Sequence, residues 1–325
     1  MKKNGTHPSF GRVSQFISMV CLAAALAGCA TPHITRPEAE VMPVAAGVRY
    51  EMRHFYGQDQ TKLFRQAWLP DNKPKGVLIV VHGLKEHGGQ YSELGQHLAQ
   101  KGYAVYALDL RGHGHSGGNP QFIDKFNDYL VDLALMVRSA RTQNPDTPIY
   151  LLGNDLGGTI ATRFTQMIPD AVQGLALSAP IVSVQESRYK LAALKVLATV
   201  APASPLNRLN VRAFSHGSSE SDKVGSSDPL VYSGGIPAKT AKEGLAAVQV
   251  LQEQVSKITT PVLILHGVND PVTPLFGSIA LYDDVASEKK VLRQYPELGH
   301  NLWQGEGKQQ VVNDLTDWLE ELGQK

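Results

Sequence analysis

The chain has 325 residues, of which 42% are hydrophobic, and it contains 30 glycines and 19 prolines. This length and composition suit one large α/β domain with an insertion and a leader. The formal net charge is only +1 and no basic tract stands out, so the composition gives no reason to expect nucleic acid as a partner.

The first 29 residues have the pattern of a bacterial export signal. Three basic residues precede the apolar run 16–27, which is too short to span a bilayer comfortably. The run ends in Leu26-Ala27-Gly28-Cys29, which resembles the lipobox of bacterial lipoproteins. The resemblance implies lipid on Cys29, a membrane attachment through it and, because Ala30 follows, a place in the cell envelope at the outer membrane. A plain secretory signal or an anchor helix is the alternative.

After a tether over residues 30–47, apolar runs alternate with helix-like segments up to residue 325. Residues 62–69 are expected to form an early strand. Short apolar runs predict buried strands at 77–81, 104–108, 148–152, 172–178 and 261–265. Helical segments are expected at 91–101, 159–168 and 308–322. This alternation indicates βαβ units and a doubly wound, mostly parallel sheet within a domain that spans 48–325.

The alternation breaks between about 180 and 235. Leucine or valine recurs every three residues from Leu191 to Val200, and the polar, serine-rich stretch 215–227 follows. We interpret the whole segment as an inserted cap with one apolar helix. Its leucines can pack on the core and also line a substrate entrance.

The segment Gly153-Asn154-Asp155-Leu156-Gly157-Gly158 lies between a buried strand and a helical segment. Glycines around such a turn let the backbone take a strained conformation that presents the central side chain above the sheet. That position is typical of a nucleophile, and here it carries the carboxylate of Asp155.

Three further motifs lie in predicted loops, two of them directly after predicted strands. Leu84 lies in a loop after 77–81, Asp270 lies just past 261–265, and His300 precedes the last helix. The carboxyl ends of the strands in an open α/β sheet meet at one edge, where such sites assemble. We therefore predict Asp155 as nucleophile, His300 as general base and Asp270 as the carboxylate that orients it. The backbone amides of Leu84 and Leu156 are the predicted oxyanion donors.

These motifs resemble those of the monoacylglycerol lipase and lysophospholipase group of α/β-hydrolases, of the serine aminopeptidase S33 type. The resemblance spans about residues 50–322 and is carried by segments 82–87, 108–118 and 227–232. It implies an α/β-hydrolase fold with a cap, a small apolar or lipid-like substrate, and structural roles for Asp109 and Arg111. No metal or organic cofactor is indicated, and the oligomeric state is left open.

The departure from this group is at the elbow, where the group has Gly-His-Ser-Met-Gly-Gly. A carboxylate attacks esters poorly, because the adduct collapses backwards or gives a high-energy anhydride. At a saturated carbon it can displace a leaving group and form an alkyl ester, which His300 and water would hydrolyse. Epoxide opening is favoured over dehalogenation, since Leu156 stands where dehalogenases usually have tryptophan, and Tyr189 is the clearest cap residue to protonate the leaving oxygen.

Two alternatives stay open. One is hydrolysis of a lipid ester by a non-standard route. The other is a non-catalytic protein that keeps the fold to bind a lipid or a partner, its nucleophile having been lost.

Overall fold

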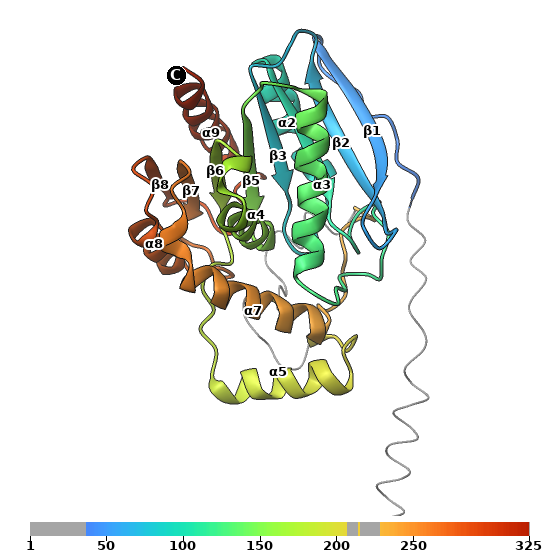
Figure 1. Ribbon diagram of the computed structural model, residues 1–325, viewed down its shortest axis with the longest axis vertical. Coiled ribbons are helices and arrows are strands. Elements are labelled where there is room, and N and C mark those ends of the chain that lie inside the picture. The colour runs from blue at the N-terminus through green and yellow to red at the C-terminus, as the bar shows by residue number, and fades with distance from the viewer. Residues whose placement is uncertain (1–36, 207–213, 215–227, 325) are drawn as a thin grey trace, which may run out of the picture. The chain divides into compact units, whose positions relative to one another are not determined.

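The computed structural model describes residues 37–206, 214 and 228–324, and its centre is an eight-stranded sheet (Figure 1). The strand order is β1-β2-β4-β3-β5-β6-β7-β8. The predicted leader with Cys29, the start of the tether and residues 207–213 and 215–227 of the predicted cap lie outside the described residues. The strands are β1 (Val48–Tyr56), β2 (Lys62–Pro70), β3 (Gly76–Val81), β4 (Tyr103–Asp109), β5 (Ile149–Asn154), β6 (Gly174–Ser178), β7 (Val262–Gly267) and β8 (Lys290–Tyr295).

The sheet is parallel from β4 to β8, while β2 runs antiparallel to both β1 and β4. This confirms the predicted mostly parallel, doubly wound sheet. The five apolar runs coincide with β3 to β7, all of whose residues are buried. The edge strands β1 and β8 were not predicted, because both are partly exposed and so lack a continuous apolar run.

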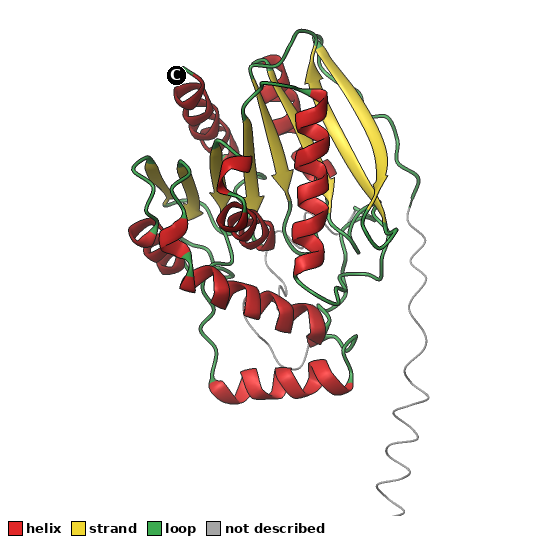
Figure 2. Ribbon diagram, in the orientation of Figure 1, coloured by secondary structure: helices red, strands yellow, loops and turns green. Residues whose placement is uncertain are grey.

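Helices cover both faces of the sheet (Figure 2). Buried side chains of α2 and α9 belong to the core on one face, and those of α3, α4 and α8 belong to the core on the other. None of the described helices is both long and apolar enough to cross a membrane. The helices are α2 (Ser92–Gln100), α3 (Asn127–Gln143), α4 (Leu156–Met167), α5 (Arg188–Val200), α7 (Ala238–Glu253), α8 (Leu275–Asp284) and α9 (Lys308–Gly323), with short 3-10 turns η1 (Gly88–Tyr91), η2 (Pro169–Ala171) and η6 (Val255–Lys257).

The connection from β6 to β7 contains α5 and α7, and α7 packs against both α4 and α5 (Figure 1). The predicted cap, about 180–235, falls inside this connection, and its boundaries stay a prediction. Only Leu194 and Ala198 of α5 are fully buried, whereas Val200 is 73% exposed. A helical face repeats every 3.6 residues, so the three-residue spacing from Leu191 to Val200 drifts off the buried side.

Candidate active site

The turn between β5 and α4 presents Asp155 through a strained backbone. Asp155 has φ 52° and ψ −118°, a conformation that non-glycine residues rarely adopt. Gly157 permits the turn to approach β3, since a Cβ there would lie 2.0 Å from the carbonyl oxygen of Val81. The strand-turn-helix geometry expected of a nucleophile elbow is therefore present.

The carboxylate of Asp155 is buried and bound by the predicted oxyanion loop. The backbone amide of Leu84 donates to Oδ2 of Asp155 at 2.9 Å, and the Asp155 side chain is 1% exposed. Leu156 opens α4, so its amide is one of the first-turn amides that lack an acceptor within the helix. It stays a predicted second donor. One oxygen of Asp155 thus already lies against the loop predicted to stabilise an oxyanion.

His300 bridges the two aspartates of the site. Its Nδ1 lies 2.8 Å from Oδ2 of Asp270, and its Nε2 lies 3.7 Å from Oδ1 of Asp155. The second distance is longer than a hydrogen bond but close enough for strong charge interaction. Asp155 therefore has one oxygen at the Leu84 amide and the other facing the imidazole.

Asp270 is held firmly by the loop after β7. Its Oδ1 accepts from the backbone amides of Val272 at 2.7 Å and Thr273 at 2.9 Å, and its Oδ2 accepts from the Thr273 hydroxyl at 2.6 Å. Burial alone would raise the pKa of Asp270, but hydrogen bonds from His266, His300 and Thr273 hold that pKa well below its usual value. Asp270 is consequently a fixed negative charge behind His300.

These charges determine the protonation of His300. Burial lowers the pKa of His300, but the hydrogen bond to Asp270 and the charges of Asp270, Asp155 and Glu86 outweigh it and raise the pKa to about 9. At neutral pH the resting site therefore holds an imidazolium between two carboxyl groups. Such a His300 cannot accept a proton until one of the neighbouring charges is removed.

The structure brings Asp155, Asp270, His300 and the Leu84 amide together from four separate loops, and Leu156 adjoins Asp155. Their catalytic roles stay predictions. Tyr189, the predicted proton donor of the cap, is 73% exposed, and its hydroxyl accepts from Arg188 at 3.1 Å. This exposed position gives no support to a role for Tyr189 in the chemistry.

The expected structural roles of Asp109 and Arg111 correspond to observed contacts. Asp109 accepts from the amides of Gly88 at 2.7 Å and His115 at 2.8 Å, and so joins two loops at the end of β4. Arg111 binds Asp132 through two nitrogens, at 2.7 and 2.8 Å.

Two residues near the site have no role in the prediction made from the sequence. Thr273 bonds Asp270 and lies 3.2 Å from Nδ1 of His300. Glu86 lies in the oxyanion loop, where its carboxyl group accepts from the amide of Gly83 at 2.8 Å. One sequence feature could have pointed to Glu86: it is an acidic residue that follows a fully buried strand within a few positions.

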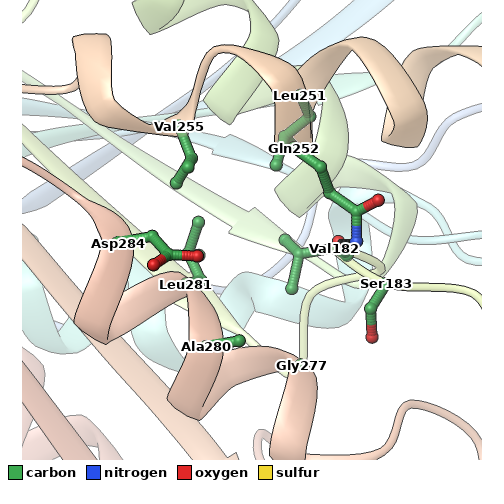
Figure 3. A pocket seen from close by; sticks show the side chains of 9 residues that line it. All are labelled: Val182, Ser183, Leu251, Gln252, Val255, Gly277, Ala280, Leu281 and Asp284. Carbon is green, nitrogen blue, oxygen red and sulfur yellow. Dashed lines mark hydrogen bonds between the residues drawn. The ribbon is translucent and has the colours of Figure 1, made fainter.

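A pocket of about 220 Å³ lies apart from these groups (Figure 3). It is bordered by the segment after β6, the end of α7 with η6, and α8. Its lining residues are Val182, Ser183, Leu251, Gln252, Val255, Gly277, Ala280, Leu281 and Asp284. None of the predicted site residues is among them. Within the described chain, no three or more histidine, cysteine, aspartate or glutamate side chains are grouped to hold a metal ion.

The sheet order, the elbow and the Asp270–His300 pair define an α/β-hydrolase. The family model for serine aminopeptidase, S33, matches residues 72–307, and the chain belongs to this family. It is 33% identical to a monoacylglycerol lipase of Mycolicibacterium smegmatis, over 82% of this chain and 95% of that protein. It is also 30% identical to the monoglyceride lipase of Rattus norvegicus, over 83% of this chain and 90% of that protein.

Solved structures agree with this assignment. The crystal structure of Paleococcus ferrophilus monoacylglycerol lipase superposes with a TM-score of 0.68 at 26% identity, covering 80% of this chain and 99% of that one. A carboxyl esterase from Bacillus coagulans, at 18% identity, shares the fold with a TM-score of 0.73. The match covers 84% of this chain and 99% of the esterase.

The raised pKa of His300 predicts a pH-dependent contribution to stability. The ion pairs of His300 should stabilise the fold fully below the unfolded-state pKa of about 6.5, and this stabilisation should be lost as pH rises through about 9. His300→Gln should therefore lower the free energy of unfolding by up to about 3 kcal/mol near pH 6 and by little near about pH 10. Denaturant unfolding across this range measures the difference. His54→Gln, at an exposed histidine of β1, is the control, and a difference for His300→Gln that does not change with pH would contradict the assignment.

Proposed function

We propose that the protein is a hydrolase of small lipid-like substrates that works through Asp155 as a covalent nucleophile. The observation that carries this proposal is that the two oxygens of Asp155 have different neighbours. Oδ2 accepts from the Leu84 amide, and Oδ1 faces Nε2 of His300. In this arrangement a carboxylate can attack through Oδ1 while its other oxygen is already placed for the hydrolysis of the resulting ester.

The first step is attack at a saturated carbon. Oδ1 of Asp155 forms a bond to the carbon as a carbon–oxygen bond of a strained ring, such as an epoxide, breaks. The released alkoxide takes up a proton that comes from His300, directly or through water. His300 can lose one in balance, because esterification of Asp155 removes a negative charge that raises the pKa of His300. A neutral imidazole and an alkyl ester on Asp155 are then left together.

The second step is hydrolysis of this ester. Neutral His300, oriented by Asp270, accepts a proton from water as the water oxygen attacks Cγ of Asp155. The negative charge that develops on Oδ2 is stabilised by the Leu84 amide and, as proposed, the Leu156 amide. Collapse expels the alcohol and restores the Asp155 carboxylate and the His300 cation, so protons balance over the cycle.

The lipid-like character of the substrate is supported by the relatives, of which several are named monoacylglycerol or monoglyceride lipases. The names of these relatives also favour a second candidate, hydrolysis of a lipid ester. With Asp155 at the elbow, that reaction would proceed by direct attack of water rather than through an acyl-enzyme. The two candidates differ in where the oxygen of water arrives.

A single turnover in heavy-oxygen water separates them. With an epoxide and lipid-ester panel, the covalent route should place one heavy oxygen in the Asp155 carboxylate, detected by mass spectrometry of the peptide that contains Asp155. His300→Gln should accumulate the alkyl-enzyme on this peptide and slow release by about 10²- to 10⁴-fold. Turnover that leaves the peptide unlabelled would favour direct attack of water. Copurified lipid without any turnover would favour a binding protein.

Replacement of the nucleophile tests the rest of the site independently. Asp155→Ser should gain hydrolysis of short p-nitrophenyl esters, because His300 can then deprotonate the serine and Leu84 can stabilise the oxyanion. Asp155→Ala, which removes any nucleophile, is the matched control and should stay inactive. A folded Asp155→Ser variant no more active than Asp155→Ala would count against the roles of His300 and Leu84.

We also propose that Cys29 carries lipid and anchors the protein in the bacterial cell envelope, at the outer membrane. The support is the small-residue motif 26–29 after a short apolar run. Cys29→Ser should shift the protein from the membrane fraction to the soluble fraction on cell fractionation. Retention of the variant in the membrane fraction would exclude Cys29 as the sole anchor.

A further inference from the structure

Glu86 joins the oxyanion loop to the nucleophile elbow. Its Oε2 accepts from the amide of Gly83 at 2.8 Å and from the hydroxyl of Tyr91 at 2.9 Å. The side-chain amide of Asn154 lies 2.9 Å from Oε1 and 3.2 Å from Oε2. Gly83 precedes Leu84 and Asn154 precedes Asp155, so the carboxyl group of Glu86 contacts the neighbours of both the oxyanion donor and the nucleophile.

The same cluster extends to the loop of His300. The ring of Tyr91 packs on that of Trp303, with centroids 6.1 Å apart, and Trp303 donates through Nε1 to the Ser178 hydroxyl at 2.9 Å. Trp303 lies three residues after His300 in the same loop. Glu86 is therefore placed to influence the relative positions of Asp155, His300 and the Leu84 amide.

Asn154 supplies an independent clue to the protonation of Glu86. Its side chain is buried, yet its Oδ1 has no hydrogen-bond partner among the residues that the structure describes. An unsatisfied buried acceptor costs about 1–3 kcal/mol. The terminal torsion of asparagine is soft, so a small rotation lets Oδ1 accept a proton from Glu86 while Nδ2 stays near the other Glu86 oxygen. Only a protonated Glu86 can make this pair of bonds.

We propose that Glu86 is a positioning residue that acts as a neutral carboxylic acid paired with Asn154, so that no second negative charge adjoins the nucleophile Asp155. The inference rests on the proposed function, since it assigns Glu86 a part in the same reaction. Its physical basis is the charge balance of the site. An ionised Glu86 would add a third carboxylate to a site that holds one imidazolium.

The charged and titratable groups facing Glu86 agree with the neutral form. Burial and the charge of Asp155 raise the pKa of Glu86, against the hydrogen bonds from Gly83 and Tyr91 and the charge of His300, and the net direction is upward. Ionised Glu86 would in turn raise the pKa of His300 and so oppose the proton release that the first step requires. A neutral Glu86 thus keeps His300 able to become a base.

Infrared spectroscopy tests the protonation directly and needs no turnover. At neutral pH the wild-type protein should show the C=O stretch of a protonated carboxylic acid that is lost in Glu86→Gln and kept in Glu306→Gln, which alters an exposed glutamate. In Asp155→Asn the band should titrate at lower pH, because the like charge is gone. Absence of the band in the wild type, or its persistence in Glu86→Gln, would overturn the proposal, whatever the fate of the proposed function.

Kinetics test the positioning role. Glu86→Gln imitates the neutral acid, so it should retain kcat/KM within about threefold and keep activity further into the alkaline range than the wild type. Glu86→Ala should lower kcat/KM by up to about 10²-fold, because a small misplacement of the reacting groups can cost that much. Equal loss in Glu86→Gln and Glu86→Ala, with both variants folded, would show that a neutral side chain of the same shape cannot replace Glu86 and would refute the inference.

Discussion

The left-handed backbone of Asp155 is the constraint on which the site depends. Such a conformation costs on the order of 1–3 kcal/mol and persists only when the surrounding structure fixes it. Here the amide of Asp155 donates to Ser178 at the end of β6. The carbonyl of Asp155 accepts from Gly158 in α4 and from Ile181. The sheet and the helix thus hold the turn, and the side chain is directed at Leu84 and His300.

The carboxylate at this turn changes the predicted base as well as the predicted nucleophile. A serine would be neutral, so it would not contribute the charge by which Asp155 raises the pKa of His300. With Asp155, the resting histidine is cationic and the nucleophile needs no deprotonation. In the proposed mechanism the two changes suit each other, because a nucleophile that is already ionised requires a base only in the second step, after its own charge has been removed.

Sequence patterns revealed the buried frame of this protein better than its exposed or polar parts. The run 77–81 predicted β3 because a strand covered on both faces must be apolar throughout. Helix α3, in contrast, has an acidic residue, Asp132, on its buried side, paired with Arg111, which obscures the apolar pattern. Motif spacing likewise located Asp155, Asp270 and His300. The contacts of Glu86 join residues 83, 91 and 154, and no local pattern encodes them.

The predicted oxyanion loop also contacts Asp228 and Tyr232, which lie near the end of the predicted cap. His87 lies 2.8 Å from Asp228, and the amide of Tyr232 donates to the carbonyl of Lys85 at 3.2 Å. Burial lowers the pKa of His87, but the hydrogen bond and charge of Asp228, with Asp109, give a net increase that favours an ion pair.

Segment 83–87 is therefore held at Gly83 by the side chain of Glu86, and at Lys85 and His87 by Tyr232 and Asp228. The Leu84 amide lies between these two attachments, which explains how this backbone donor is kept at 2.9 Å from Asp155. A substrate bound under the predicted cap would meet this amide already fixed, as electrostatic stabilisation of an oxyanion requires.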